Sequence, residues 1–222
     1  MPPAPARASD VVQLVILVGS LRAESWNRRL CQLVADEAPS GVSVELLGVG
    51  KIPLYDDDLL QAGEPDTVSA LRRAVAGADG VLVNTPVYNH GMSGVMKNAI
   101  DWLSRPAFAG ELLGKPAAVV CATVGRNEPT EAAAQARLAT AVCAAVMMDE
   151  PDLLVRSIGH RVAEARAVAE AGAAEAGEVA EAAGSVAGGP WPDSIALPVQ
   201  DFLARFVEHV GAVRSARPEE ES

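Results

Sequence analysis

The loop that follows the first apolar run of the chain carries residues suited to holding an anion. Residues 19–27 read Gly-Ser-Leu-Arg-Ala-Glu-Ser-Trp-Asn and lead from a β-branched apolar segment into a helical pattern. Backbone amides at a helix N-terminus attract anions. Ser20, Ser25 and Asn27 add short polar side chains, and Arg22 adds a planar charged fork. A phosphate group fits this loop, although an ordinary strand-to-helix turn in which Ser25 only caps the helix is the alternative.

A second loop, residues 85–94, combines a rigid backbone with an aromatic ring and an amide. It reads Thr-Pro-Val-Tyr-Asn-His-Gly-Met-Ser-Gly. Pro86 restricts the backbone, Tyr88 offers a ring, and Asn89 can both donate and accept hydrogen bonds. These groups suit the edge of a flat heteroaromatic ring that carries carbonyl and imide groups, such as a flavin. A purely structural turn with a half-buried Tyr88 remains the alternative.

Short apolar runs alternate with helical patterns along the chain, and this order predicts the sheet that positions these loops. The expected strands cover residues 11–18, 42–47, 81–83, 116–123 and, more weakly, 153–158. The expected helices cover residues 26–39, 68–78, 94–103, 130–145 and 195–213, and residues 51–66 read as a turn-rich stretch. Such alternation predicts a parallel sheet with helices on both faces. Ligands bind beyond the carboxyl ends of such strands, where loops 19–27, 86–94 and 123–129 would meet.

Composition and charge restrict the class of protein. Of the 222 residues 50% are hydrophobic and 21% are charged, which is enough for one sizeable core. The formal net charge of −11 disfavours binding to nucleic acid or to an anionic membrane surface. No apolar run approaches the ~20 residues that a membrane span needs. Cys31, Cys121 and Cys143 lie in apolar segments without C-x-x-C spacing, which predicts free thiols, no metal site and a cytoplasmic protein.

A single domain is expected over residues 10–215. Residues 1–9 form a Pro/Ala-rich lead and residues 216–222 an acidic tail, both predicted to be disordered. Between about 161 and 189 Ala, Glu and Gly dominate and large apolar residues are missing. This insertion is therefore expected to be a marginal exposed helix or a mobile segment.

Five motifs in order resemble the NADPH-dependent FMN reductase family, which includes flavodoxin-like quinone, azo-dye and chromate reductases. The motifs lie at residues 19–27, 52–56, 85–89, 94–105 and 114–116. By this resemblance the fold is α/β, a flavodoxin-like doubly wound five-stranded parallel sheet of order 2-1-3-4-5. FMN would bind between strands one and three. Such a protein is an NAD(P)H-dependent FMN oxidoreductase that passes electrons from NADPH or NADH to a quinone-like or other small acceptor.

The resemblance also assigns residues to the cofactor. It implies that Ser20, Arg22, Ser25 and Asn27 hold the FMN phosphate. It places the ring edge against Pro86, Val87, Tyr88 and Asn89, with Thr123 and Gly125 at the other end of the ring. The cofactor carries the hydride chemistry, so no catalytic side chain and no metal ligand is assigned. The helix at 94–105 is expected to form the contact of a homodimer.

Two departures from the family pattern leave other functions open. Val87 stands where the family commonly has Glu, and residues 123–131 replace family glycines and an arginine with Glu128, Pro129 and Glu131. A carboxylate there is expected to disfavour the phosphates of NADPH. The alternatives are a reductase that supplies reduced flavin to a partner monooxygenase, a non-enzymatic flavodoxin-like electron carrier, or a flavin-free scaffold with the same fold.

Overall fold

The computed structural model describes residues 11–125, 128–175 and 191–216. The predicted disordered lead lies outside the described residues, and so do the last part of the Ala/Glu-rich insertion and all of the predicted tail except Ala216. Within the described residues, none of the helices is both long and apolar enough to cross a membrane.

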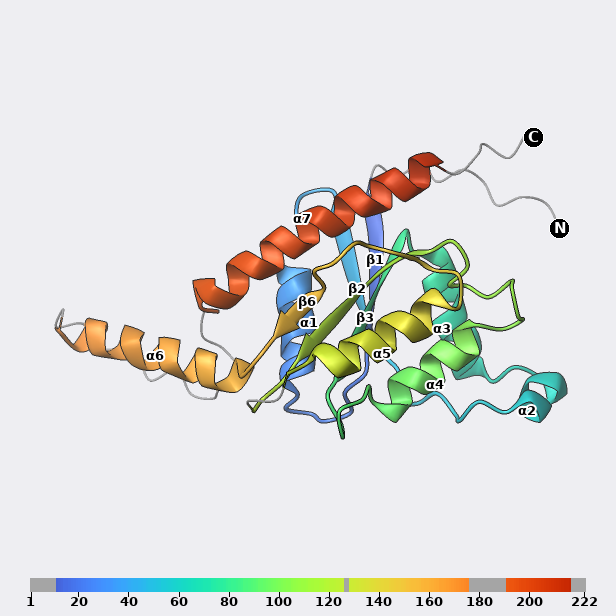
Figure 1. Cartoon of the computed structure of the whole chain (residues 1–222), viewed down its shortest axis with the longest axis horizontal. Helices are drawn as coiled ribbons and strands as arrows, with labels where there is room; N and C mark the ends of the chain where they lie inside the picture. The colour runs from blue at the N-terminus through green and yellow to red at the C-terminus, as the bar shows by residue number, and fades with distance from the viewer. Residues whose placement is uncertain (1–10, 126–127, 176–190, 217–222) are drawn as a thin grey trace.

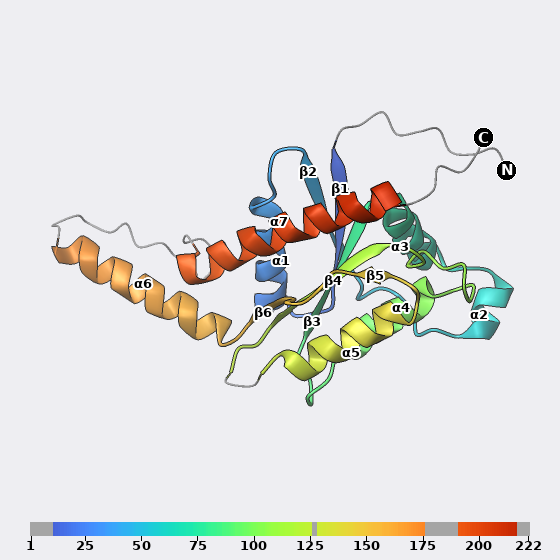
Figure 2. The same ribbon diagram turned by 45° about the horizontal axis from the view of Figure 1, so that its top comes forward.

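A twisted parallel sheet forms the centre of the molecule (Figures 1 and 2). Its strands run in the order β2-β1-β3-β4-β5, with β6 also paired to β4, and every pairing is parallel. The strands are β1 (Val12–Val18), β2 (Val42–Gly48), β3 (Gly80–Pro86), β4 (Pro116–Ala122), β5 (Val146–Met147) and β6 (Leu153–Val155). Strands β3 and β4 are buried along their whole length, as is usual for central strands of a parallel sheet. The predicted order 2-1-3-4-5 is confirmed, but two short strands share the fifth place, so the predicted five strands are six.

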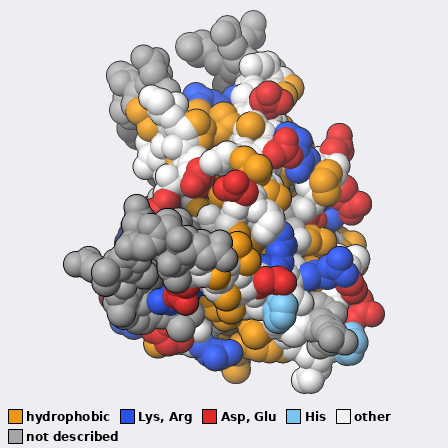
Figure 3. Space-filling model, turned by 90° about the vertical axis from the view of Figure 1, so that its left-hand side faces the viewer, with side chains coloured by type: hydrophobic (Ala, Val, Ile, Leu, Met, Phe, Trp, Pro, Cys, Tyr) orange, Lys and Arg blue, Asp and Glu red, His pale blue; other side chains and the backbone are white. Residues whose placement is uncertain are grey.

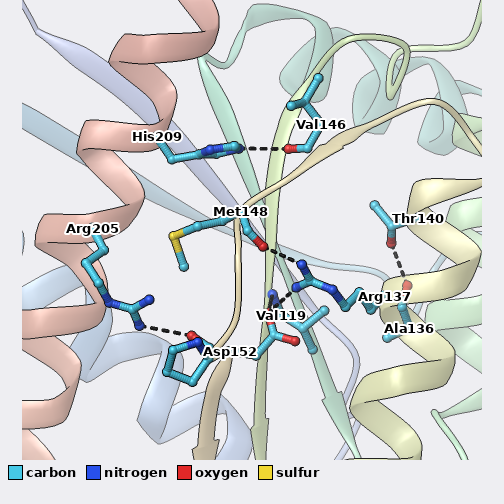
Figure 4. A network of polar contacts seen from close by, with 10 residues as sticks. Val119, Ala136, Arg137, Thr140, Val146, Met148, Asp152, Arg205 and His209 are labelled. Atoms are coloured by element: carbon cyan, nitrogen blue, oxygen red, sulfur yellow. Dashed lines mark hydrogen bonds and ion pairs between the residues drawn. The ribbon is translucent and has the colours of Figure 1, made fainter.

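The gap between β5 and β6 is closed by side chains instead of strand pairing (Figure 4). Asp152 Oδ1 accepts a hydrogen bond from the backbone N–H of Val119, 3.0 Å away, where a continuous strand would have supplied a carbonyl. Arg137 donates to Asp152 Oδ1 at 3.0 Å and also to the carbonyl oxygen of Met148. From the other face, Arg205 donates to the carbonyl oxygen of Pro151. Periodicity could not reveal this break, because it depends on side chains from distant helices.

Helices cover both faces of the sheet, as predicted (Figure 2). The helices α1 and α7 pack on one core with β1, β3 and β4, and α3, α4 and α5 pack on a second core across the sheet. Their bounds are α1 Trp26–Asp36, α3 Asp66–Gly77, α4 Gly94–Leu103, α5 Thr130–Ala141 and α7 Asp193–Ala216. Helix α5 ends four residues before the predicted end, because the chain turns there to enter β5. Ser93 caps α4 by accepting from the N–H of Met96, as predicted.

Two further helices lie outside the five predicted ones, and the second agrees with the expectation of an exposed helix in the insertion. Helix α2 (Asp57–Ala62) lies in the stretch predicted as turns; it is only six residues long and none of them is buried, so it leaves no apolar period. Helix α6 (Ile158–Glu175) contains the first part of the Ala/Glu-rich insertion. It projects away from the sheet in both views (Figures 1 and 2).

We expect the charge of Asp152 to oppose folding at neutral pH. Burial, the largest effect, raises the pKa of this carboxyl above its ordinary value of 3.8 despite the nearby Arg137. A raised native pKa means that the contribution of Asp152 to stability is lost as pH rises through the native pKa. In urea titrations, Asp152→Asn should therefore become more stable relative to the wild type as pH rises from about 4 to 7.

Asp152→Ala is the matched comparison, because it removes the acceptor for Val119 N–H as well as the charge. It should cost about 1–3 kcal/mol at every pH in that range, since a buried donor is left unpaired. The opposite result, a wild type that becomes more stable relative to Asp152→Asn as pH rises, would contradict this prediction. It would show that the ion pair with Arg137 outweighs the cost of burying the charge.

Candidate flavin site

A pocket of about 200 Å³ lies at the carboxyl ends of β1, β3 and β4, where the three predicted loops meet. Every residue predicted for the cofactor lines it except Asn89. Trp26, Ala122 and Val124 also line it and were not predicted. The lining residues are Ser20, Arg22, Ser25, Trp26, Asn27, Pro86, Val87, Tyr88, Ala122, Thr123, Val124 and Gly125. Trp26 is the first residue of the helix predicted over residues 26–39. Its position directly after the cap residue is the signal that could have placed it in the pocket.

The loop after β1 offers free hydrogen-bonding groups next to a helix N-terminus. Ser25 caps α1 and accepts a hydrogen bond from the N–H of Arg28 at 3.3 Å, which leaves its own O–H free to donate. Ser20 is buried, yet its hydroxyl has no hydrogen-bond partner among the described residues. Arg22 is exposed and makes no ion pair within the described part of the chain. The capping role of Ser25 and an anion site are therefore compatible.

Asn27 has a different task from the other residues of this loop. Its Oδ1 accepts from the N–H of Ala122 and from Nδ2 of Asn84, each at 3.0 Å, and its Nδ2 donates to the carbonyl oxygen of Ala122 at 2.9 Å. Only one amide hydrogen remains for a ligand. Asn27 thus joins the first turn of α1 to the ends of β3 and β4. Asn84 was not predicted, because its partner Asn27 lies on α1 and comes close to it only in the folded chain.

The loop after β3 is a tight turn tied to the loop after β1. Tyr88 and Gly91 exchange two backbone hydrogen bonds of 2.9 Å, and Asn89 and His90 between them have φ of 50° and 62°. This geometry places Asn89 at the exposed tip of the turn, outside the pocket lining. Ser93 Oγ donates to the carbonyl oxygen of Gly19 at 2.8 Å, which links the two loops.

Gly19 permits the close approach of β1 and β3 at the pocket. A Cβ at this position would lie 2.5 Å from the carbonyl oxygen of Asn84, a distance that no side chain could occupy. The N–H of Gly19 donates to that same oxygen at 2.9 Å. The first glycine of the motif is therefore required by the spacing of the strand ends.

The two carboxylates that depart from the family pattern are each paired. Glu128 forms an ion pair with Arg156, and Glu131 lies 2.6 Å from Nδ1 of His90. All four side chains are more than half exposed, so these pairs are solvent-screened. The face at the α6 end carries acidic and basic side chains side by side (Figure 3). The expected repulsion of NADPH by Glu128 is therefore reduced by the Arg156 guanidinium beside it.

The residues present fit a flavin mononucleotide. The Arg22 guanidinium and the buried Ser20 hydroxyl, both without a partner among the described residues, lie beside a helix N-terminus, and such groups suit an anion. Pro86, Val87 and Tyr88 supply an apolar and aromatic wall on the other side of the same pocket. A phosphate and a flat ring joined by a short chain would use both parts.

Comparison with known proteins agrees with this geometry. Residues 12–159 match the model of the NADPH-dependent FMN reductase family. A 2-hydroxy-1,4-benzoquinone reductase from Burkholderia sp. is 35% identical over 151 residues, which cover 68% of this chain and 82% of that protein. A quinone reductase from Escherichia coli K12 is 36% identical over 156 residues, covering 69% and 82%.

A solved structure is similar over nearly the whole chain. The flavoenzyme NAD(P)H:(acceptor) oxidoreductase FerB from Paracoccus denitrificans superposes with a TM-score of 0.72 and 29% identity, and the match covers 91% of this chain and 98% of FerB. The flavodoxin-like fold predicted from the motifs is thereby confirmed. The chain belongs to the NADPH-dependent FMN reductase family and is an NAD(P)H-dependent oxidoreductase that works with FMN.

Proposed function

We propose that the enzyme reduces small quinone-like acceptors with NADPH or NADH through FMN held in the pocket at the strand ends. The observation that carries this assignment is the combination, in one pocket, of the unpaired Arg22 at the start of α1 with the wall formed by residues 86–88. Two of the relatives compared above carry quinone reductase in their names. FMN bound there would supply the hydride chemistry between the nicotinamide and the second substrate.

The residues of the chain bind and orient the reactants. Ser20, Arg22 and Ser25 hold the phosphate, and Asn27 adds its one remaining N–H. Pro86, Val87 and Tyr88 face the ring edge, with Asn89 holding the turn that carries them. Thr123 and Gly125 close the other end.

Tyr88 stands at the mouth of the pocket, where a flat acceptor can stack. Half of its surface is exposed, 50%. The loop after β3, called the ring loop below, carries apolar Val87 and no carboxylate at that position. This suits an uncharged aromatic acceptor such as a quinone.

We also propose that two copies associate through the surface formed by α4 and residues 52–56. Asn98 and Trp102 of α4 both donate to the carbonyl oxygen of Pro53 at 2.8 Å, and the guanidinium of Arg105 lies over the ring of Tyr55. These contacts fix a rigid surface. Leu54 of this surface is 81% exposed and Phe108, three residues after Arg105, is 94% exposed, so the proposed contact would bury two large apolar side chains.

A reducing compartment such as the cytoplasm is proposed as the location. In the described chain all three cysteines are free, and burial raises the pKa of the Cys121 thiol to about 12. The thiols are therefore built as apolar core groups and not as disulfide partners.

The first prediction concerns the phosphate end of the pocket. Arg22→Ala should weaken FMN about tenfold or more while leaving riboflavin nearly unchanged, because only FMN has the phosphate that a guanidinium can bind. Arg28→Ala is the control, since Arg28 is also exposed but does not line the pocket. Titration of the apoprotein with each flavin measures both constants. Equal losses for FMN and riboflavin would place Arg22 away from the phosphate.

The second prediction separates the proposed function from its alternatives. With one equivalent of bound FMN and excess benzoquinone, the enzyme should oxidise NADPH steadily, each NADPH and one proton reducing one quinone to hydroquinone. A flavin reductase that serves a partner would instead depend on added free FMN. An electron carrier would stop after one turnover of its own flavin. Stopped-flow and steady-state absorbance of NADPH distinguish the three.

The third prediction concerns assembly. Light scattering should show a dimer for the wild type and a monomer for Leu54→Asp, because a buried carboxylate without a partner opposes association. Leu197→Asp, on α7 across the sheet, is the control; Leu197 is 58% exposed and lies outside the proposed contact. A monomeric wild type, or a Leu54→Asp variant that stays dimeric, would contradict the proposed contact surface.

A further inference from the structure

The first turn of α6 contacts two walls of the pocket, although no motif of the sequence includes it. Ser157, which precedes α6, reaches the loop after β4, and Gly159, its second residue, lies against Trp26. We propose that Ser157 and Gly159 are positioning residues for the flavin, which set the geometry of Thr123–Gly125 and of Trp26 without touching the cofactor. This inference rests on the proposed flavin site.

The loop after β4 depends on Ser157 for its shape. The hydroxyl of Ser157 donates to the carbonyl oxygen of Gly125 at 3.0 Å, and its backbone N–H donates to Oγ1 of Thr123 at 3.4 Å. Backbone bonds on either side, from Thr123 N–H to Val155 and from Ile158 N–H to Thr123, are both 2.9 Å. The pocket-lining residues 123–125 are thus attached to the turn between β6 and α6.

The backbone of Ser157 is held in an uncommon conformation. Its φ is 49°, in the left-handed region that residues other than glycine rarely adopt. Such a conformation persists only where surrounding contacts determine it. Here those contacts are the two hydrogen bonds to the pocket loop and the bond from Arg161 N–H to the carbonyl oxygen of Ser157 at 3.0 Å.

Gly159 sets the position of the second wall. A Cβ there would lie 3.1 Å from Nε1 and 3.3 Å from Cε2 of Trp26, so the indole rests directly on the helix backbone. On its other sides the indole meets the edge of Trp191, with ring centroids 6.3 Å apart, and the guanidinium of Arg29, 4.8 Å from the ring. A side chain at position 159 would therefore displace the Trp26 indole, which lines the pocket.

These contacts are confined to the start of α6. The rest of the helix projects away from the sheet, as both ribbon views show (Figures 1 and 2). From Ala167 to Ala171 every side chain is exposed. The positioning role therefore belongs to Ser157 and Gly159 and not to the length of the helix.

Ser157→Gly tests the first contact, since glycine keeps the backbone N–H and tolerates the positive φ while the hydroxyl is lost. We expect the dissociation constants of FMN and of riboflavin to rise by the same factor, about threefold to tenfold, as for one lost hydrogen bond. The visible circular dichroism of the bound flavin should change as well, because it reports the surroundings of the ring. Ser157→Asn, whose side chain can donate and which tolerates the same φ, should restore part of the affinity.

Gly159→Ala tests the second contact and separates positioning from stability. Alanine favours a helix over glycine, so the melting temperature of the apoprotein should stay or rise while flavin affinity falls. Gly211→Ala on α7 is the control, because a Cβ there has nothing within 4 Å. It should leave flavin affinity unchanged.

The outcomes separate this inference from the proposed function. Wild-type protein that takes up neither flavin would overturn both. Wild-type protein that binds FMN, with Ser157→Gly and Gly159→Ala matching it in affinity and in circular dichroism, would overturn only the positioning role. A drop in the melting temperature of both variants with unchanged flavin binding would likewise show a purely structural role.

Discussion

The amide of Asn27 is the interaction on which the pocket depends, because it joins α1 to two strands of the sheet. Strands β3 and β4 pair along their length, and among the described residues the Asn27 side chain hydrogen-bonds their ends to the first turn of α1. Both polar atoms of the amide are used, and the whole cluster is buried, so each hydrogen bond is formed in surroundings where an unpaired group would be costly. The anion site at the start of α1 and the ring loop after β3 are therefore held in one fixed relation.

That fixed relation is extended by contacts from three other parts of the chain. Ser93 ties the ring loop to Gly19, and the start of α6 ties the loop after β4 to β6. At the edge of the sheet, Asp152 and Arg137 replace the backbone pairing that the fifth strand lacks beside β4. The β4 end that carries Ala122 and Thr123 is thus supported from α1, from α6 and from the interrupted strand. A rigid rim of this kind suits an enzyme whose chemistry resides in the cofactor, since the protein then has only to bind and orient it.

The charges that follow the loop after β4 modify what the family pattern implies. Glu128 and Glu131 stand where the family pattern has glycine or arginine, but each contacts a side chain from another part of the chain, Arg156 or His90. The ion pair between Glu128 and Arg156 joins two opposite charges, and the carboxylate of Glu131 contacts the His90 ring nitrogen. Both carboxylates are therefore partnered and solvent-screened.

Much of the fold and the site could be predicted from the sequence alone. Short apolar runs between turn-rich loops identified β1, β3 and β4, because their length and flanking residues favour buried strands over helices, and the five motifs identified the family and most of the pocket lining. Glu131 and His90, 41 residues apart, could not be paired from the sequence, nor could the break in the fifth strand be seen, because both depend on side chains that meet only after folding. The same holds for Asn89, whose side chain type suits a ring edge but which lies at the exposed tip of its turn.

The sequence by itself determined the order of elements, the family and the residues available for binding, because local periodicity and motif chemistry are carried by neighbouring residues. Only the tertiary structure decided that most of the hydrogen-bonding capacity of Asn27 is used by the strand ends, that Trp26 lines the pocket, and that Ser157 and Gly159 contact its lining residues. Hydrogen-bond partners and close packing are set by residues far apart in the chain.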